Sequence, residues 1–369
     1  MEYNELNITK LPPPRTLTTS RIGYIDALRG FAIFLVVFGH VLQYAMNMAD
    51  YNATVLNVFF LPIWLPLFFF VSGFVVYKPY ESFGLSSYFT KIKEKTITLF
   101  IPATVFYILY CLVFGKYPFG FLQHGWSLYW FTIVLLEILI VFYSILILVR
   151  ITHVPDIVVD ILLVFISLFG VGWVAFLNKH GGFYSTLHIS EFCKYFQFFT
   201  LGYLFNKHSV VVCKIVNNKF FRTFVIIGFL VCSLFYFNED VQVEYPFLFH
   251  MIHDVVICYC GLFVVYIFFF SHAAFFDNDS KIASCFKFVG KRTLDIYLLH
   301  YFLIPDCTAI VPYVSSSKQA LFLLVIVVCL TLVIGSLSLL FSEIIRTSDI
   351  LSYLLFGVKK GNKQQIKVV

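Results

Sequence analysis

Charge is what this sequence has least of. Asp, Glu, Lys and Arg make up 12% of its 369 residues, while 60% are hydrophobic and 20% aromatic. Soluble domains carry roughly 25% charged and about 45–50% apolar residues, so this balance excludes an ordinary soluble globular protein. Phe and Tyr occur 47 and 23 times, which suits a lipid-facing surface with aromatic belts. The composition therefore indicates a polytopic membrane protein.

Patterned cysteines and clustered basic residues are also missing. The nine Cys form no CxxC pair, so no disulfide framework is expected, and the sequence predicts no metal site. The net charge is +6, but no basic stripe with interleaved aromatics lies outside the loops. Nucleic acid is therefore not an expected partner.

Long apolar runs fill most of the chain. Ten have the length that a helix needs to cross a bilayer, at residues 27–48, 55–78, 95–115, 127–149, 156–177, 190–206, 221–237, 246–270, 292–313 and 319–344. The predicted fold class is all-α: a polytopic transmembrane helical bundle. We expect a flexible cytoplasmic lead at 1–20, a transmembrane domain at 21–345 and a basic cytoplasmic tail at 346–369.

The distribution of Lys and Arg sets the orientation of the ten spans. With a cytoplasmic N-terminus, the inner segments and adjoining span ends hold 21 of the 26 Lys and Arg. The outer loops hold three, Lys116, Lys179 and Lys318, and Arg29 and Lys194 lie within spans. This asymmetry predicts that both termini are cytoplasmic.

Two ionisable residues interrupt the first span. Arg29 lies about one turn inside, and His40 follows eleven positions later. Eleven residues make close to three helical turns, so both side chains project from nearly the same face, about 16 Å apart along the axis. Arginine can hold phosphate bidentately, and imidazole can act near neutral pH as a general base or carry an acyl group. Either residue alone could be structural, but together they indicate a cavity or a partner helix.

Two other early spans carry polar residues. Glu137 lies near the middle of the fourth span and shares a helix face with Trp130. It could orient His40, or stay protonated and bond a helix backbone. In the second span, Ser72-Gly73 allows close backbone approach, more readily by a helix than by a ligand.

The ninth span carries a second histidine at membrane depth. Tyr297 and His300 share a helix face at i, i+3, and His300 lies at a depth similar to that of His40. Asp295 points elsewhere, so Lys291 or Arg292 is its expected partner. Taken alone, His300 suits a hydrogen-bonded packing role.

The segment between the second and third spans combines lysines with an apolar stripe. Its apolar residues recur at helical spacing: Leu85, Tyr88, Phe89 and Ile92. This pattern is typical of an interfacial amphipathic helix, here on the cytoplasmic side. Its lysines, Lys91, Lys93 and Lys95, either only meet anionic lipid or also frame a site for a phosphate-bearing ligand.

The first span, YIDALRGFAIFLVVFGH at residues 24–40, resembles the first-helix signature of the acyltransferase-3 family of integral membrane acyltransferases, with its Arg-x10-His spacing. Residues 68–74 resemble the family's FFxxSGF segment, and residues 93–102 its basic stretch ending in LxIP. Residues 128–131, 198–203 and 289–300 resemble later elements. The resemblance covers residues 21 to about 345. Many members carry Arg-x-x-Arg before LxIP, where this chain has Lys95-x-x-Thr98.

The resemblance implies transfer of an acyl group, with acetyl expected, from cytoplasmic acyl-CoA to a hydroxyl of a cell-surface glycan or its lipid-linked precursor. The expected location is a bacterial inner membrane. Acyl-CoA would be a co-substrate, with no permanently bound cofactor, and membrane lipid would surround the protein. With the depth and helix-face arguments above, we expect His40 as general base, Arg29 and Glu137 to be the catalytic residues. The expected donor contacts are Arg29, Lys91, Lys93, Lys95 and Ser72, and the expected acceptor contacts are Trp130, Tyr297 and His300.

On physical grounds alone, a transporter or flippase for a polysaccharide precursor fits equally well, because intramembrane charges also line transport paths. The sequence shows no internal repeat, which counts mildly against a transporter. A non-catalytic scaffold is disfavoured, since nothing structural requires Arg29, His40 and Glu137 inside the spans.

Reporter fusions at two loops test the topology. Lys179 lies in an outer loop and Lys214 in an inner one if all ten spans cross the membrane. We expect a periplasm-active reporter to work only at Lys179 and a cytoplasm-active reporter only at Lys214. The same side for both fusions would contradict the predicted arrangement.

Overall fold

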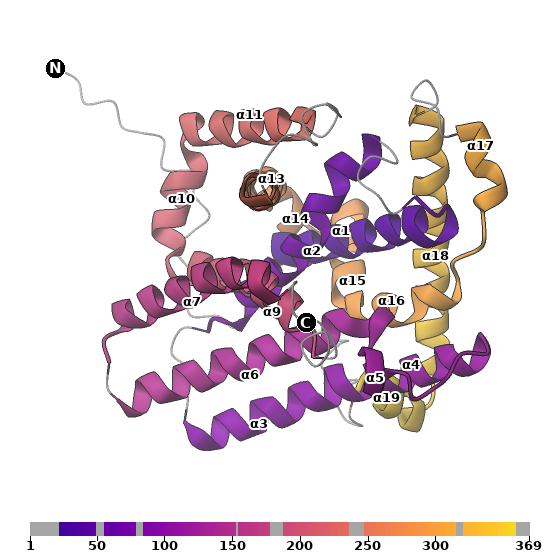
Figure 1. The fold of residues 1–369 in the computed structure, drawn as a ribbon, viewed down its shortest axis with the longest axis horizontal. Helices are drawn as coiled ribbons and strands as arrows, with labels where there is room; N and C mark the ends of the chain where they lie inside the picture. The colour runs from indigo at the N-terminus through magenta and orange to yellow at the C-terminus, as the bar shows by residue number, and fades with distance from the viewer. Residues whose placement is uncertain are drawn as a thin grey trace.

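The computed structural model describes residues 22–48, 55–78, 84–152, 154–177, 187–235, 247–314 and 320–358. Within these ranges the chain is helical and contains no β-strand (Figure 1). The predicted lead at 1–20 lies outside the described residues. The longer helices are α1 (Gly23–His40), α2 (Val55–Val76), α3 (Leu85–Lys95), α4 (Ile101–Val113), α6 (Trp130–Ile151), α7 (Asp156–Leu177), α9 (Ile189–Lys207), α11 (Lys219–Phe235), α13 (Phe247–Ser271), α15 (Lys281–Lys291) and α18 (Ala320–Ile345). The shorter helices are α5 (Phe121–His124), α10 (Ser209–Asn217), α14 (Ala273–Asp277), α16 (Thr293–Leu299), α17 (Val311–Val314) and α19 (Asp349–Phe356).

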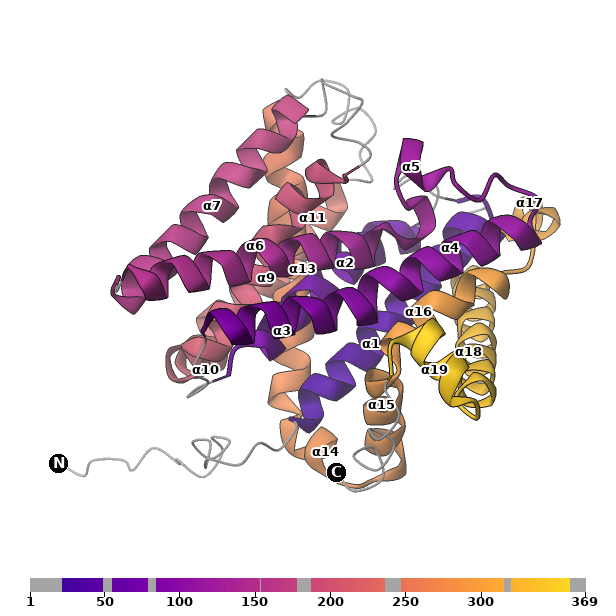
Figure 2. The same ribbon diagram turned by 90° about the horizontal axis from the view of Figure 1, so that it is seen from below.

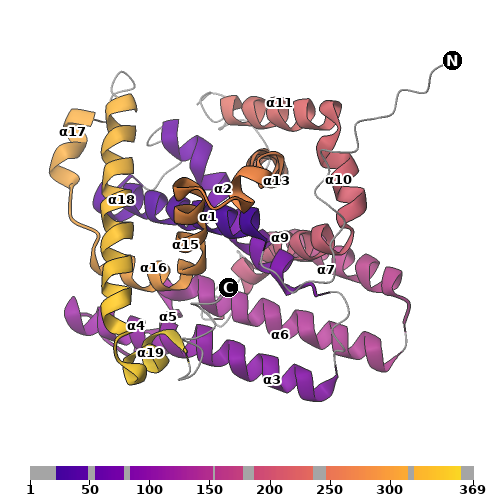
Figure 3. The ribbon, with the colours of Figure 1, turned by 180° about the vertical axis from the view of Figure 1, so that it is seen from behind.

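Seven helical stretches among the described residues are long and apolar enough to cross a membrane. They are Gly23–Ala45, Leu56–Val76, Leu85–Val113, Ser127–Ile151, Asp156–Trp173, Met251–Ser271 and Ala320–Ile345. The pair α10 and α11, bent by 74° at the corner visible in Figure 3, would make an eighth. The all-α fold of an integral membrane protein is thus supported, whereas ten spans and two cytoplasmic termini stay predictions.

Two of the predicted spans look different in the structure. At 190–206, α9 is one helix, but it carries Glu191 and Lys194 and is not among the apolar stretches. The segment 292–313 is not one helix, because α16 ends at Leu299, a 3₁₀ turn His300–Phe302 follows, and residues 304–307 are not helical. Pro305 accounts for this break, since proline lacks a backbone N–H and disfavours helix in the residue before it.

The amphipathic helix predicted around 85–92 is present as α3. It does not stop at the start of the next span, however. A π-helical segment, Thr96–Phe100, joins it to α4, and together they form a stretch of 29 residues that Figure 2 shows as one long rod. Tyr88 holds α3 to α6, with its hydroxyl 3.1 Å from that of Ser144.

Helix α1 is the most buried of the seven apolar stretches and lies in the interior of the bundle (Figure 2). It packs against α2, α13, α14, α15, α16 and α18. Its contact with α15 is backbone to backbone: a Cβ on Gly290 would overlap the carbonyl of Asp26, and a Cβ on Gly30 would overlap that of Phe286. The predicted arginine–histidine face therefore lies on a helix surrounded by protein.

Glycines also bring α2 and α9 together. A Cβ on Gly73 would overlap the carbonyl of Phe199, and a Cβ on Gly202 would overlap that of Phe70. This confirms that the small pair Ser72-Gly73 serves close helix packing. The hydroxyl of Ser72 itself donates to the carbonyl of Phe68 in the same helix, at 2.8 Å.

A buried carboxylate ties α16 to α18. Asp295 is 3% exposed and accepts two hydrogen bonds from Arg346, both of 2.9 Å, and one from the hydroxyl of Ser342. The predicted partner Arg292 lies 3.6 Å from the same carboxylate and pairs more closely with Glu343, at 2.6 Å. Arg346, the main partner, was not predicted because it lies 51 residues away in the sequence.

The first part of the predicted basic tail forms a short helix, α19. After Arg346, the hydroxyl of Ser348 caps α19, which packs on α4 through Phe356 and Phe106. Residues 359–369 lie outside the described part of the chain.

Replacing the buried carboxylate tests whether it anchors α16. Asp295→Asn leaves the guanidinium of Arg346 without its bidentate partner, and breaking a buried pair costs about 3–5 kcal/mol. We expect a clear fall in the thermal denaturation midpoint of the detergent-purified protein. The matched control is Asp279→Asn, because Asp279 also pairs with a basic residue, Lys287, but its own side chain is fully exposed. Equal midpoints for both variants would contradict the anchoring role.

Candidate functional site

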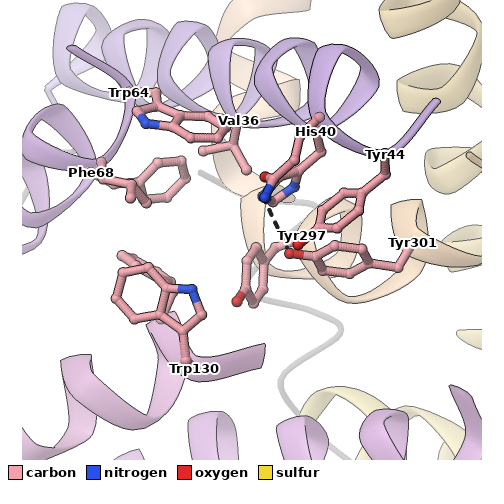
Figure 4. Close-up of a pocket in the computed structure, with 11 residues that line it drawn as sticks. Val36, His40, Tyr44, Trp64, Phe68, Trp130, Tyr297 and Tyr301 are labelled. Carbon is pink, nitrogen blue, oxygen red and sulfur yellow. Dashed lines mark hydrogen bonds between the residues drawn. The ribbon is translucent and has the colours of Figure 1, made fainter. Parts of the chain in front are cut away.

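A cavity of about 220 Å³ lies where α1, α2, α6 and α16 meet. Aromatic side chains make up most of its wall (Figure 4). Its lining residues are Val36, His40, Gln43, Tyr44, Trp64, Leu65, Phe68, Trp130, Phe131, Tyr297 and Tyr301. Three residues singled out from the sequence, His40, Trp130 and Tyr297, therefore meet around one space although they come from three different helices.

His40 and His300 are in direct contact. The Nδ1 atom of His40 lies 2.7 Å from Nε2 of His300. The two ring planes differ by 6°, and their centroids are 5.0 Å apart. With the short nitrogen–nitrogen distance, these values place the rings edge to edge in nearly one plane, which is good geometry for a hydrogen bond.

A backbone carbonyl gives this hydrogen bond a direction. The Nδ1 atom of His300 lies 3.0 Å from the carbonyl oxygen of Ile296. A carbonyl can only accept, so Nδ1 of His300 carries the proton, and in neutral imidazole its Nε2 is then an acceptor. Nδ1 of His40 must therefore donate to it, and the lone pair of His40 remains on Nε2. That nitrogen faces the hydroxyl of Tyr301, 3.3 Å away.

Two tyrosines fix the segment that carries His300. The hydroxyl of Tyr129 donates to the carbonyl of Leu298 at 3.1 Å, and the hydroxyl of Tyr297 donates to the carbonyl of Leu128 at 3.0 Å. These reciprocal bonds join the start of α6 to the end of α16. His300, which is fully buried, is thereby held in place from both sides.

The chain departs from regular helix next to His40. A π-helical segment, Val41–Ala45, begins at the following residue, and π-turns are frequent at functional sites. Two side chains of this segment, Gln43 and Tyr44, line the cavity. On the other side of His40, a Cβ on Gly39 would overlap the ring of Trp64. Glycine at this position therefore lets the indole lie against α1, with its ring 5.2 Å from that of His40.

The structure does not bring Glu137 to His40. Glu137 is half-buried on α6, is not among the residues that line the cavity, and interacts electrostatically with Glu191 at the start of α9. The position beside Nδ1 of His40 is taken by His300 instead. Ser72 lines neither this cavity nor the second one described next, so the roles predicted for Glu137 and Ser72 gain no support from the geometry.

A second cavity, of about 410 Å³, lies between the end of α2, α3 and α6. It is polar and carries three lysines. Its lining residues are Val75, Val76, Lys78, Ser86, Ser87, Thr90, Lys91, Glu94, Lys95 and Tyr143. Two of the predicted donor contacts, Lys91 and Lys95, are present, Lys93 is not, and Lys78 joins them from two residues beyond the end of α2. We call this space the lysine cavity.

Arg29 belongs to the same charged region. Arg29, Lys78 and Lys91 are all close enough to Lys95 for their charges to act on it. The guanidinium of Arg29 also lies 3.5 Å from the hydroxyl of Thr293 and 3.9 Å from the carboxylate of Asp26. Asp26 thus pairs with Arg29, and at the start of α1 the backbone N–H of Tyr24 donates to the carboxylate of Asp277 at 3.1 Å.

The two cavities lie along the same pair of helices. On α2, Phe68 lines the aromatic cavity and Val75 the lysine cavity, which are about 10 Å apart along the helix. On α6, the corresponding residues are Phe131 and Tyr143, about 18 Å apart. The two cavities therefore lie one after the other along α2 and α6.

Sequence reasoning missed the contacts that depend on distant segments. Tyr301 follows His300 directly, but the irregular backbone after Leu299 hides its direction from any helical pattern. No sequence pattern marked Trp64 or Lys78 as site residues. Gly39, immediately before His40, was the one local indication that a large side chain, that of Trp64, packs against α1 at this point.

Comparison with known proteins assigns a family to most of the chain. The acyltransferase-3 family model, described as an acyltransferase domain, matches residues 22–341. The match includes α1 with Arg29 and His40, the lysine cavity and α16 with His300. No curated protein and no solved structure matches the chain. Because the family model covers most of the sequence, the chain belongs to the acyltransferase-3 family of membrane acyltransferases.

Proposed function

We propose that this protein transfers an acyl group, with acetyl expected, from cytoplasmic acyl-CoA to a hydroxyl of a cell-surface glycan or its lipid-linked precursor. The observation that carries the proposal is the directed chain from the carbonyl of Ile296 through His300 to His40. It leaves a basic nitrogen, Nε2 of His40, at a cavity large enough for a small ring. This is the arrangement that general-base catalysis of hydroxyl attack requires.

His40 acts as the base in this proposal. Nε2 takes the proton of the acceptor hydroxyl as its oxygen attacks the thioester carbon. The positive charge that develops on His40 is stabilised through Nδ1–H by His300, whose own proton stays bonded to the carbonyl of Ile296. His300 therefore orients the base without taking part in the transfer, a positioning role rather than the acceptor contact expected from the sequence.

The donor enters through the lysine cavity in this proposal. Phosphates of acyl-CoA would meet Lys78, Lys91 and Lys95, with Arg29 on the side toward α1. Ammonium groups supply point charge and guanidinium a bidentate fork. The pantetheine arm would then run along α2 and α6, which line both cavities, and would bring the thioester to His40.

The acceptor occupies the aromatic cavity. Trp64, Phe68 and Trp130 surround it with flat apolar surfaces, against which the C–H faces of a sugar ring pack (Figure 4). The side-chain amide of Gln43 is a polar group of the cavity wall that orients such a ligand. Trp130 therefore keeps its predicted acceptor role, whereas the hydroxyl of Tyr297 is bonded to Leu128 and contributes its ring.

The donor site is tested at Arg29. Arg29→Lys keeps the charge but removes the bidentate phosphate contact, which should weaken binding of acetyl-CoA by about 1.5–3 kcal/mol. Isothermal titration of the protein in nanodiscs measures this. Arg150→Lys, at the exposed end of α6, is the matched control and should bind as the wild type does. Unchanged affinity in both Arg29→Lys and Arg29→Ala would remove Arg29 from the donor site.

The base is tested by comparing the two histidines. Release of CoA from acetyl-CoA is followed with a panel of methyl hexosides as acceptors, using purified protein. We expect His40→Ala to abolish transfer, because general-base assistance contributes about 10²–10⁴-fold. His300→Ala should lower the rate only in part, since Nε2 of His40 remains.

The variants must be expressed in the membrane and monodisperse for this comparison to count. Retained turnover in His40→Ala, with loss only in His300→Ala, would overturn the mechanism and move the base to the ninth predicted span.

A further inference from the structure

The proposed roles of His40 as base and His300 as its orienting partner give no role to Tyr301, although its side chain contacts both rings. It lies in the 3₁₀ turn after α16, is 6% exposed and lines the aromatic cavity. Its ring is 4.0 Å from that of His300 and 4.9 Å from that of His40. In Figure 4 its hydroxyl points to His40, where the dashed line marks the 3.3 Å contact with Nε2.

The hydroxyl of Tyr301 differs from those of the neighbouring tyrosines. Tyr129 and Tyr297 both donate to backbone carbonyls, which ties their hydroxyls to the fold. Within the described residues, the hydrogen bond of the Tyr301 hydroxyl is made to the basic nitrogen of His40. Because that nitrogen holds a lone pair, Tyr301 is the donor, over a distance at the long end for such a bond.

An acceptor hydroxyl must take the place of this contact. When it donates its own proton to Nε2 of His40, the O–H of Tyr301 loses its partner and is left beside the reacting atoms. A buried donor without an acceptor is unfavourable. The nearest new acceptor in the reaction would be the thioester carbonyl oxygen, whose negative charge grows as the acceptor oxygen attacks.

We propose that Tyr301 is a further catalytic residue, whose hydroxyl donates a hydrogen bond to the oxyanion of the tetrahedral intermediate. The inference rests on the proposed acyl transfer. The acceptor O–H proton moves to Nε2 of His40, the C–O bond forms, and the carbonyl electron pair becomes the oxyanion held by Tyr301. The carbonyl then re-forms, the C–S bond breaks, and the thiolate takes the proton from His40. Alcohol and thioester thus become ester and free thiol.

One hydroxyl serves two stages in this scheme. Before the acceptor binds, it donates to the lone pair of His40, and during the reaction it stabilises the negative charge two bonds away from the attacking oxygen. Donors of this kind contribute about 10²–10³-fold to the turnover rate, because they act on charge that exists only in the transition state.

The experiment compares Tyr301→Phe with the wild type. Phenylalanine keeps the ring packing on both histidines and removes only the hydroxyl. With acetyl-CoA and the methyl hexoside that supports the fastest wild-type turnover, we expect kcat to fall about 10²–10³-fold and KM for acetyl-CoA to change little. The matched control is Tyr259→Phe, which removes a hydroxyl that donates to Gln197 outside the cavity; it should turn over as the wild type does.

Turnover with a second acyl donor, chloroacetyl-CoA, distinguishes loss of transition-state stabilisation from a structural defect. Chloroacetyl-CoA carries a more electron-poor carbonyl that needs less help at the oxyanion. The ratio of its kcat to that of acetyl-CoA should rise at least tenfold in Tyr301→Phe. This ratio does not depend on how much of the variant is folded.

The outcomes are distinct. An unchanged ratio, or a kcat within twofold of the wild type, would overturn the role of Tyr301 and leave the proposed function standing. Acetyl-CoA-dependent turnover absent from the wild type itself would overturn both.

Discussion

The hydrogen bond between Nδ1 of His300 and the carbonyl of Ile296 is the contact on which the proposed chemistry of the site depends. A carbonyl cannot donate, so this one contact fixes the tautomer of His300, and through it that of His40. If the direction were reversed, Nε2 of His40 would carry a proton and could not act as a base. The carbonyl belongs to the same helical turn as His300, so the direction is built into α16.

The rest of the fold holds that contact in place. Asp295, one residue before Ile296, binds α16 to Arg346 just after α18, while two tyrosine–carbonyl bonds join its other end to the turn before α6. Helix α1 brings His40 to His300 from the interior of the bundle, where Gly30 and Gly290 let α1 and α15 touch through their backbones. Charged and polar groups inside a membrane protein must be paired with one another or with the backbone, and here that pairing also positions the nitrogen that we propose as the base.

The sequence predicted the helical fold and the surroundings of His40 in part. Spacing alone placed Arg29 and His40 on one face, and Trp130, Tyr297 and His300 all reach the region of His40. Glu137 does not, because periodicity gives the face of one helix but not the neighbour toward which that face turns. Contacts such as Asp295 with Arg346, 51 residues apart, depend on tertiary packing that no local pattern contains. Pro305 marked the span 292–313 as irregular, but the sequence did not show where α16 ends, because the residues between Leu299 and Pro305 are still mostly apolar.

Nitrogen-15 NMR of the histidine side chains tests the central claim most directly. Protein labelled with ¹⁵N-histidine and held in nanodiscs at neutral pH would be measured as wild type and as His40→Gln, which identifies the His40 signals by their loss. The account predicts a protonated Nδ1 and an unprotonated Nε2 for His40, and a protonated Nδ1 for His300. A proton on Nε2 of His40, with Nδ1 bare, would contradict it.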